Sequence, residues 1–249
     1  MAESNVLRAL TRRAEEDLRS RRVRVLLEEV VLDLPRVVEA QPVGQLGQGG
    51  PVCIVPGLST EAGGTPDVMR GEETQMLGAD LAPNSICVLP GTHAKWAWIG
   101  DTGQVTHFST YMTGELYGLL TKYGILGRLM TFGQDAPEAF EAGVLLGLEQ
   151  SDNATHVIFA ARTAGLMGRV PPEGLPDYLS GILMGIEIAS GTRAGRPRDV
   201  VLLGDGDLCS RYEKALSLAG IASTRAPDGA TTRGQWLVAQ RAGLLEHAA

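Results

Sequence analysis

The sequence has 249 residues, of which 44% are hydrophobic and 20% charged, and its formal net charge is −7. Such a composition is typical of a soluble globular protein with one large domain or two small ones. It lacks the basic excess expected of a nucleic-acid-binding protein, and no apolar run approaches the ~20 residues of a membrane span. The three cysteines, at positions 53, 87 and 209, form no CxxC pair. Sparse, unpaired cysteines favour a reducing cytoplasm over a disulfide scaffold.

Residues 1–50 differ in pattern from the rest of the chain. Arginines alternate with acidic residues up to Glu29, and apolar residues near helical spacing predict a helix through about residue 20. Residues 40–51 are rich in Gln, Gly and Pro and predict a loop, and Val52 to Val55 predicts a short buried strand that ends at Pro56-Gly57.

The first polar cluster is Arg70-Gly71-Glu72-Glu73. A Gly/Pro loop comes before it, and the pattern predicts a helix from about Gly71 to Gly78. Both glutamates would lie in the first turn, where the helix dipole favours carboxylates. Simple helix N-terminal charge explains the pair as well as a functional reading does. In that second reading one carboxylate is a general base or faces Mg²⁺, and Arg70 holds an anionic group.

The second polar cluster follows an apolar run from Ser85 to Leu89 and precedes another from Trp96 to Ile99. This is the pattern of a strand, a tight turn and a strand. The turn contains Gly91, Thr92, His93 and Lys95. Gly91 has no Cβ, so its backbone can approach a ligand closely, and the hydroxyl and cationic groups suit a phosphate or another oxyanion. An ordinary hairpin with a polar tip is the alternative.

The middle of the chain predicts one more strand and several helices. Val105 to Thr110 completes a hairpin with the preceding strand across Gly-Asp-Thr-Gly. Thr113 is a natural N-cap for the next helix, and Asp135-Ala-Pro-Glu138 resembles a capping box with an early proline. Further helices are predicted over 156–168 and 176–190, where Gly181 and Gly185 indicate close packing against a neighbour. Glu187, in this otherwise apolar helix, is expected to be exposed or at an interface.

The last segment predicts a β-α-β-α unit. Val200 to Leu203 is followed by Gly204-Asp205-Gly206-Asp207, a helix up to Gly220, a strand from Ile221 to Thr224, and a helix from Ala230 to Leu245. A strand, a Gly-x-Gly turn and a helix can present backbone N–H groups to a nucleotide. Cys209 stands where a dinucleotide fingerprint has its third glycine, so a mononucleotide contact stays open instead.

Three segments together resemble the 2-dehydro-3-deoxygalactonokinases. They are Val68-Met-Arg-Gly-Glu-Glu-Thr-Gln75, Leu89-Pro-Gly-Thr-His-Ala-Lys-Trp96 and Met112-Thr-Gly-Glu-Leu116. The resemblance implies an α/β, actin-like (ribonuclease-H-like) ATPase fold of two domains. Residues 1–84 would be the remnant of the N-terminal domain, with 1–50 atypical, and 85–249 would be the C-terminal domain. The family's opening D-W-G-T-type phosphate loop has no counterpart in 1–50, so we expect an incomplete N-terminal domain, from truncation or a shifted reading frame.

The resemblance also implies an activity: a cytoplasmic kinase of D-galactonate catabolism that transfers the γ-phosphate of ATP to the 6-hydroxyl of 2-dehydro-3-deoxy-D-galactonate. Its partners are the sugar acid and ATP, with Mg²⁺ carried by ATP rather than by a protein metal site, and without nucleic acid or membrane. A homodimer and a gluconate-derived substrate are left open. The expected roles are phosphate and ATP binding by Gly91, Thr92, His93, Lys95, Gly204 and Gly206, with Lys95 as the mobile counter-charge, and substrate binding by Arg70, Thr113 and Arg162. The expected general base is Glu72 or Glu73, with Glu115 as the third choice.

Two other classes of function stay open at this point. One is a catalytically impaired relative that binds sugar acid or nucleotide without efficient turnover. The other is a nucleotide- or anion-binding α/β protein unrelated to kinases.

Overall fold

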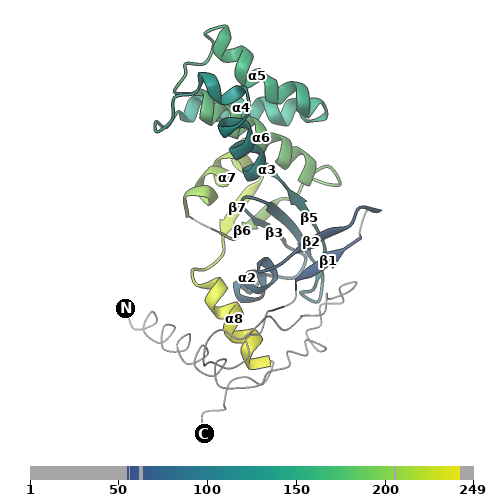
Figure 1. Ribbon diagram of the computed structural model, residues 1–249. Helices are drawn as coiled ribbons and strands as arrows, with labels where there is room; N and C mark the ends of the chain where they lie inside the picture. Colours follow the sequence, from purple (N-terminus) through teal and green to yellow (C-terminus); the bar gives the residue numbers. More distant parts are fainter. Residues whose placement is uncertain (1–54, 56, 62–63, 205, 242–249) are drawn as a thin grey trace, which may run out of the picture. The chain divides into compact units, whose positions relative to one another are not determined.

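The structure, a computed structural model, describes residue 55 and residues 57–61, 64–204 and 206–241 (Figure 1). The predicted helix through residue 20, the loop over 40–51 and most of the strand over 52–55 lie outside these residues. So does the atypical segment 1–50 as a whole.

A five-stranded sheet with the strand order β5-β4-β3-β6-β7 is the centre of the fold. Its strands are β3 (Ile86–Leu89), β4 (Ala94–Ile99), β5 (Val105–Tyr111), β6 (Asp199–Leu202) and β7 (Ala222–Arg225). Strand β6 runs parallel to both β3 and β7, with Val88 opposite Leu202 and Leu202 opposite Arg225. Central parallel strands are covered on both faces, which explains why β3 reads as an unbroken apolar run. The five strands predicted from Ser85 onward are confirmed, with ends shifted by one or two residues.

A second, two-stranded sheet lies where the sequence predicted only a loop. Strand β1 (Leu58–Thr60) pairs antiparallel with β2 (Asp67–Met69), and Leu58 lies opposite Met69. Gly64 and Pro66, on which the loop was predicted, do lie between the two strands. The strands themselves were missed because three residues are too few to show an alternating pattern. The buried pair Leu58 and Met69 marks the face of this small sheet that packs inward.

Helices α2 (Glu72–Ala79) and α8 (Ala230–Arg241) pack side by side (Figure 1). Their backbones come very close, since a Cβ on Gly78 would lie 1.9 Å from the carbonyl oxygen of Ala230. The predicted helix over 71–78 is confirmed, and Glu72 and Glu73 lie in its first turn as expected.

The remaining helices are α3 (Thr113–Lys122), α4 (Pro137–Glu149), α5 (Ala154–Leu166), α6 (Leu175–Gly191) and α7 (Gly206–Leu218), with short 3-10 turns at Leu126–Leu129 and Ser151–Asn153. The pair α4 and α6 is in close contact, because a Cβ on Gly181 would lie 2.2 Å from the oxygen of Phe140. The close packing predicted from Gly181 and Gly185 is thus confirmed. A buried apolar cluster joins α5 and α6 to the first 3-10 turn; it comprises Leu126, Val157, Ala161, Leu179, Ile182 and Leu183.

Two predicted helix caps are wrong. Met112, not Thr113, is the N-cap of α3, and the Thr113 hydroxyl bonds elsewhere. The capping box at Asp135 does not form, because Ala136 is the N-cap of α4 and its N–H donates to Asp177 Oδ2 at 2.7 Å. The early proline is confirmed, since Pro137 opens α4.

The chain divides into two compact units that are discontinuous in sequence. One contains 1–85, 97–108 and 226–249, and the other contains 86–96 and 109–225. We call them unit 1 and unit 2 and describe each by itself. The domain boundary expected between residues 84 and 85 stays a prediction.

Candidate functional site

The Pro90–His93 turn leaves strand β3 at its carboxyl end, within unit 2. Because β3, β6 and β7 are parallel, their carboxyl ends share one edge of the sheet. The ladder continues one step beyond β6, where the N–H of Leu203 donates to the Val88 oxygen at 2.9 Å. A Cβ on Gly204 would then lie 3.5 Å from the oxygen of Pro90. The two glycine turns singled out in the sequence are thus neighbours, at the edge where open α/β sheets bind ligands.

Gly91 has open space at its Cβ position. No atom of the described residues lies within 4 Å of a Cβ built there, and its φ is not in the left-handed region. Neither the backbone conformation nor packing within unit 2 therefore requires glycine. A ligand that approaches the backbone closely would require it, which matches the reading of this turn as an oxyanion site.

The first turn of α3 is fastened to the same loop. The N–H of Glu115 donates to the Thr92 oxygen at 3.0 Å, and a Cβ on Gly114 would lie 2.7 Å from the Gly91 oxygen. The Glu115 carboxylate meets His93 Nε2 at 2.5 Å. Both side chains remain partly exposed. The structure therefore brings together Gly91, Thr92, His93 and Glu115 from the predicted site.

Lys95 departs from the expected mobile counter-charge. Only 4% of the residue is exposed, and its Nζ donates to the His93 oxygen at 2.8 Å. A buried ammonium held by a carbonyl of the turn is a fixed charge rather than a mobile one. It lies beside the turn, and its role as the charge that offsets an oxyanion stays a prediction.

Glu187 is a functional candidate that the sequence reading missed. It was expected to be exposed or at an interface, yet it is only 2% exposed. Its Oε1 accepts from Trp96 Nε1 at 2.9 Å, and its Oε2 accepts from the hydroxyls of Tyr212, at 2.8 Å, and Thr113. Burial raises the pKa of this carboxyl, and the three donors offset part of that rise. A signal was present in the sequence, because Glu187 follows the buried Leu183 by one helical repeat, on the core side of α6.

The Arg70–Glu73 cluster lies in unit 1, and its carboxylates bond the adjacent backbone. Glu72 Oε2 accepts the N–H of Arg70 at 3.0 Å, and Glu73 Oε2 accepts the N–H of Gly71 at 2.6 Å. Gly71 has a φ of 105°, which favours glycine. Glu73 is nearly buried, and burial raises its pKa despite the backbone hydrogen bonds that lower it. These contacts match the helix N-terminal reading of the pair and leave Arg70 exposed.

Arg162 and Thr113 have partners other than those that the resemblance implies. Arg162, on α5, donates from Nη1 to the Ile125 oxygen at 3.0 Å and so fastens the chain after α3. Thr113 is 9% exposed and donates to Glu187. The roles of both as substrate ligands stay predictions.

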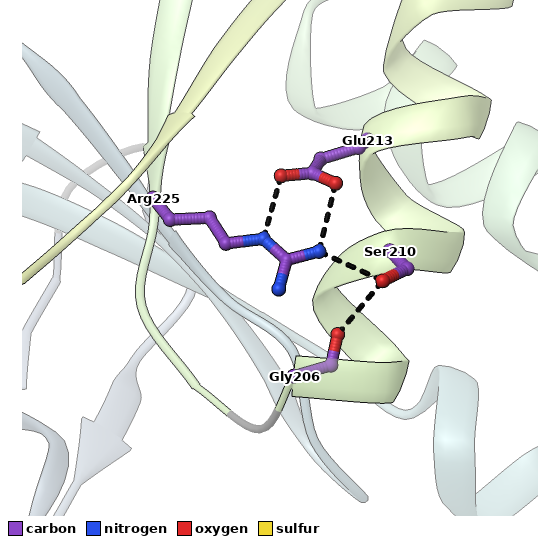
Figure 2. Close-up of polar contacts among 4 residues, drawn as sticks. All are labelled: Gly206, Ser210, Glu213 and Arg225. Carbon is purple, nitrogen blue, oxygen red and sulfur yellow. Dashed lines mark hydrogen bonds and ion pairs between the residues drawn. The ribbon is translucent and has the colours of Figure 1, made fainter. Parts of the chain in front are cut away.

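A second group missed by the sequence reading is the arginine at the carboxyl end of β7. Figure 2 shows Arg225 in a two-pronged contact with Glu213, at 2.7 and 2.8 Å, and its Nη2 also donates to Ser210 Oγ at 2.7 Å. Ser210 in turn donates to the Gly206 oxygen at 3.0 Å, at the start of α7 (Figure 2). The contact with Glu213 raises the pKa of the arginine and lowers that of the glutamate. Arg225 therefore connects the end of β7 to the turn that follows β6.

Comparison with known proteins now decides the family. The family model described as 2-keto-3-deoxy-galactonokinase matches residues 25–238. The chain belongs to this family. The match includes both glycine turns, the start of α3 and the Arg70–Glu73 cluster, so the resemblance read from the motifs is confirmed.

Individual relatives agree with this assignment. The chain is 36% identical over 174 residues to a 2-dehydro-3-deoxygalactonokinase of Escherichia coli (strain K12), covering 69% of this chain and 59% of that protein. It is 37% identical over 185 residues to a protein of Rhizobium meliloti (strain 1021) named "Probable 2-dehydro-3-deoxygalactonokinase DgoK1", covering 71% and 60%. A crystal structure of a Sinorhizobium meliloti protein bearing the same enzyme name matches with a TM-score of 0.69 and 32% identity, over 81% of this chain and 69% of that one. The chain spans about three-fifths of the length of the two curated relatives.

The family match rules out the reading as an α/β protein unrelated to kinases. Within the described part of the chain, no helix is long and apolar enough to cross a membrane. No group of three or more His, Cys, Asp or Glu side chains in these residues could hold a metal ion.

Proposed function

We propose that this chain phosphorylates 2-dehydro-3-deoxy-D-galactonate at its 6-hydroxyl with ATP, as a step in D-galactonate catabolism. Membership of the 2-keto-3-deoxy-galactonokinase family supports the reaction class, and the relatives' names supply the substrate. With this function we also propose the two-domain, actin-like fold of sugar kinases for this protein. Because ATP is the phosphoryl donor, the cytoplasm is the compartment in which we expect it.

One observation carries the proposal: the two glycine turns and the start of α3 meet at the carboxyl edge of the parallel strands. Backbone N–H groups at Gly91 and Thr92 would hold phosphate oxygens, and the fixed charge of Lys95 would offset their negative charge. Gly204 and Gly206 would face the nucleotide from the neighbouring turn. Mg²⁺ bound through the phosphates would neutralise further charge.

Glu115 is the base that this arrangement favours. Phosphoryl transfer breaks the bond between the γ-phosphorus and the ADP oxygen and forms a bond to the 6-oxygen, whose proton needs an acceptor. Glu115 lies in the same unit as the Pro90–His93 turn, which we call the phosphate turn. Its Oε2 is oriented by His93 Nε2, 2.5 Å away. Glu72 and Glu73 instead accept backbone N–H groups of their own helix start. Arg70 and Arg162 remain the candidates for the substrate carboxylate, and Thr113 remains a candidate substrate ligand.

The decisive experiment measures ADP release by the purified chain with 2-dehydro-3-deoxy-D-galactonate and, separately, with its gluconate-derived epimer. We expect turnover of the galactonate derivative. Glu115→Gln should lower kcat about 10²- to 10⁴-fold, the usual contribution of a general base. Glu138→Gln, an exposed glutamate in the first turn of α4, is the matched control and should leave kcat unchanged. No ADP release with either epimer would reject the kinase proposal, and a loss confined to Glu72→Gln or Glu73→Gln would move the base to α2.

A second candidate function is binding of the sugar acid or nucleotide without efficient turnover. The observation that favours it is in the sequence motifs, since residues 1–50 contain no counterpart of the family's D-W-G-T-type phosphate loop. Isothermal titration with each ligand alone distinguishes the two functions. Heat of binding without ADP release would identify the binder, and binding together with release would identify the kinase.

A further inference from the structure

Glu187 is a buried carboxylate, and its three hydrogen-bond donors described above are all neutral groups. It is 2% exposed, and its donors are an indole, a threonine hydroxyl and a tyrosine hydroxyl. Removing a carboxylate from water costs much free energy unless it is well hydrogen-bonded, and an apolar residue would fill the same space in α6 without that cost. A structural role in the core therefore does not explain why this residue is a glutamate.

The three donors share one property, which is their place next to a group of the candidate site. Trp96 directly follows Lys95 in β4, the strand that begins where the phosphate turn ends. Thr113 directly precedes the residues of α3 that contact Gly91 and Thr92. Tyr212 lies on α7, the helix that begins at Gly206. One carboxyl group thus joins the three elements that carry the phosphate turn, the favoured base and the nucleotide-side turn.

Helix α6 holds Trp96 by packing against its ring as well as by the hydrogen bond from its indole N–H to Glu187. A Cβ on Gly191, one turn after Glu187, would lie 2.8 Å from the Trp96 ring. The ring itself is fully buried. The indole is therefore held at its N–H by Glu187 and on its ring by the end of the same helix, so it has little freedom to move apart from α6.

We propose that Glu187 is a positioning residue that holds the phosphate turn, the start of α3 and the start of α7 in one fixed arrangement. It touches no substrate and acts through Trp96, Thr113 and Tyr212. The expected effect of Glu187 on catalysis rests on the proposed function. Its expected effect on the rigidity of the three segments does not.

Two substitutions separate hydrogen bonding from side-chain volume. In Glu187→Gln the amide oxygen can accept from Trp96, and the amide nitrogen can donate to the oxygens of Thr113 and Tyr212, so all three contacts persist. Glu187→Met keeps the length of the side chain but offers only a weak acceptor. Val157→Ala is the matched control, because it removes buried volume from an apolar cluster of the same unit that contains none of the three donors.

The measurements are amide hydrogen exchange over 86–96, 109–116 and 206–216, and the kinetic constants for both substrates. For Glu187→Met we expect exchange about tenfold faster in all three segments, and kcat/KM about tenfold lower or more, from the loss of buried hydrogen bonds worth about a factor of ten together. Glu187→Gln should restore both quantities to within about threefold of wild type. Val157→Ala should speed exchange around α5 and leave kcat/KM unchanged. If Glu187→Met fails to fold, Tyr212→Phe replaces it and should speed exchange in 206–216 more than in 86–96.

Two outcomes would overturn the proposal: unchanged exchange in the three segments of Glu187→Met, or an equal increase there in Val157→Ala. For the Tyr212→Phe replacement, equal exchange changes in both segments would do so. A wild-type chain that releases no ADP would reject the kinase function alone, since the exchange measurements would still decide the role of Glu187.

Discussion

At the scale of single residues, the environment of Glu187 makes stability depend on pH. Burial raises the pKa of its carboxyl in the folded chain above the ordinary value of 4.5. Between those two pKa values the folded chain binds more protons than the unfolded chain does. The free energy of unfolding must then fall as pH rises through this interval, by up to about 1.4 kcal/mol for each pH unit.

We therefore predict that wild type loses stability relative to Glu187→Gln as the pH is raised from about 4.5, because the amide does not titrate. The other titratable groups that interact with this carboxyl are Tyr111 and Tyr212, whose pKa values are raised above 10, so both stay neutral in this range. Urea unfolding of both proteins at several pH values measures the difference. The raised pKa of Glu73 affects both proteins equally and cancels. A difference that does not vary with pH, or that varies with the opposite sign, would contradict the prediction.

Residue-scale features are also where sequence reasoning was least complete. The glycine, threonine and histidine of the phosphate turn could be singled out because their residue types suit one chemistry. The partner of Thr113 could not, because Thr113 bonds a glutamate 74 positions later in the chain. Glu187 could have been assigned to the core from its spacing after Leu183, but a charged residue on a helix is usually exposed, and that general rule was applied instead.

At the scale of elements, periodic patterns predicted well and short ones did not. Helix α6 shows four apolar residues at helical spacing, and the structure places its ends within one residue of the prediction. Strands β1 and β2 have three residues each, and it is their pairing with one another that defines them. Hydrophobic periodicity needs at least two repeats to be visible, so such a hairpin lies below what a sequence pattern can show.

The contact between α4 and α6 depends on glycines, which gives a testable prediction at this scale. A Cβ on Gly147 would lie 2.3 Å from the Ile182 oxygen, so the two helices would have to separate. We predict that Gly147→Ala lowers the free energy of unfolding by about 1–3 kcal/mol, the usual cost of overpacking. Urea denaturation measures this loss.

Gly118→Ala is the matched control for that prediction. Gly118 lies within α3, and a Cβ there would meet no atom within 4 Å of it. The same substitution should raise stability by about 0.5–1 kcal/mol, because alanine loses less backbone entropy in a helix than glycine does. If both substitutions changed the free energy of unfolding equally, helix propensity and not helix contact would determine the effect of Gly147→Ala.

At the scale of the whole molecule, ligand binding should appear as a gain in stability. A ligand that binds only the folded chain stabilises it by RT ln(1 + [L]/Kd), which is about 2.7 kcal/mol at one hundred times Kd. The protein carries a net charge of −7, yet both proposed ligands are anions, so attraction must come from local groups rather than from the overall field. The local groups of unit 2 that we propose for this attraction are the backbone N–H groups of the phosphate turn and the fixed charge of Lys95.

We therefore predict that ATP with Mg²⁺ raises the unfolding midpoint and slows amide exchange in two segments of unit 2, residues 90–95 and the start of α7. Gly91→Val is the informative variant, because a larger side chain would enter the open space beside that turn and should remove the gain in midpoint while leaving the unliganded midpoint nearly unchanged. Thermal unfolding with and without nucleotide, followed by exchange measurements, tests both statements. Slower exchange confined to other segments, or a Gly91→Val protein that gains as much from nucleotide as wild type does, would show that ATP binds elsewhere than at the carboxyl edge of the sheet.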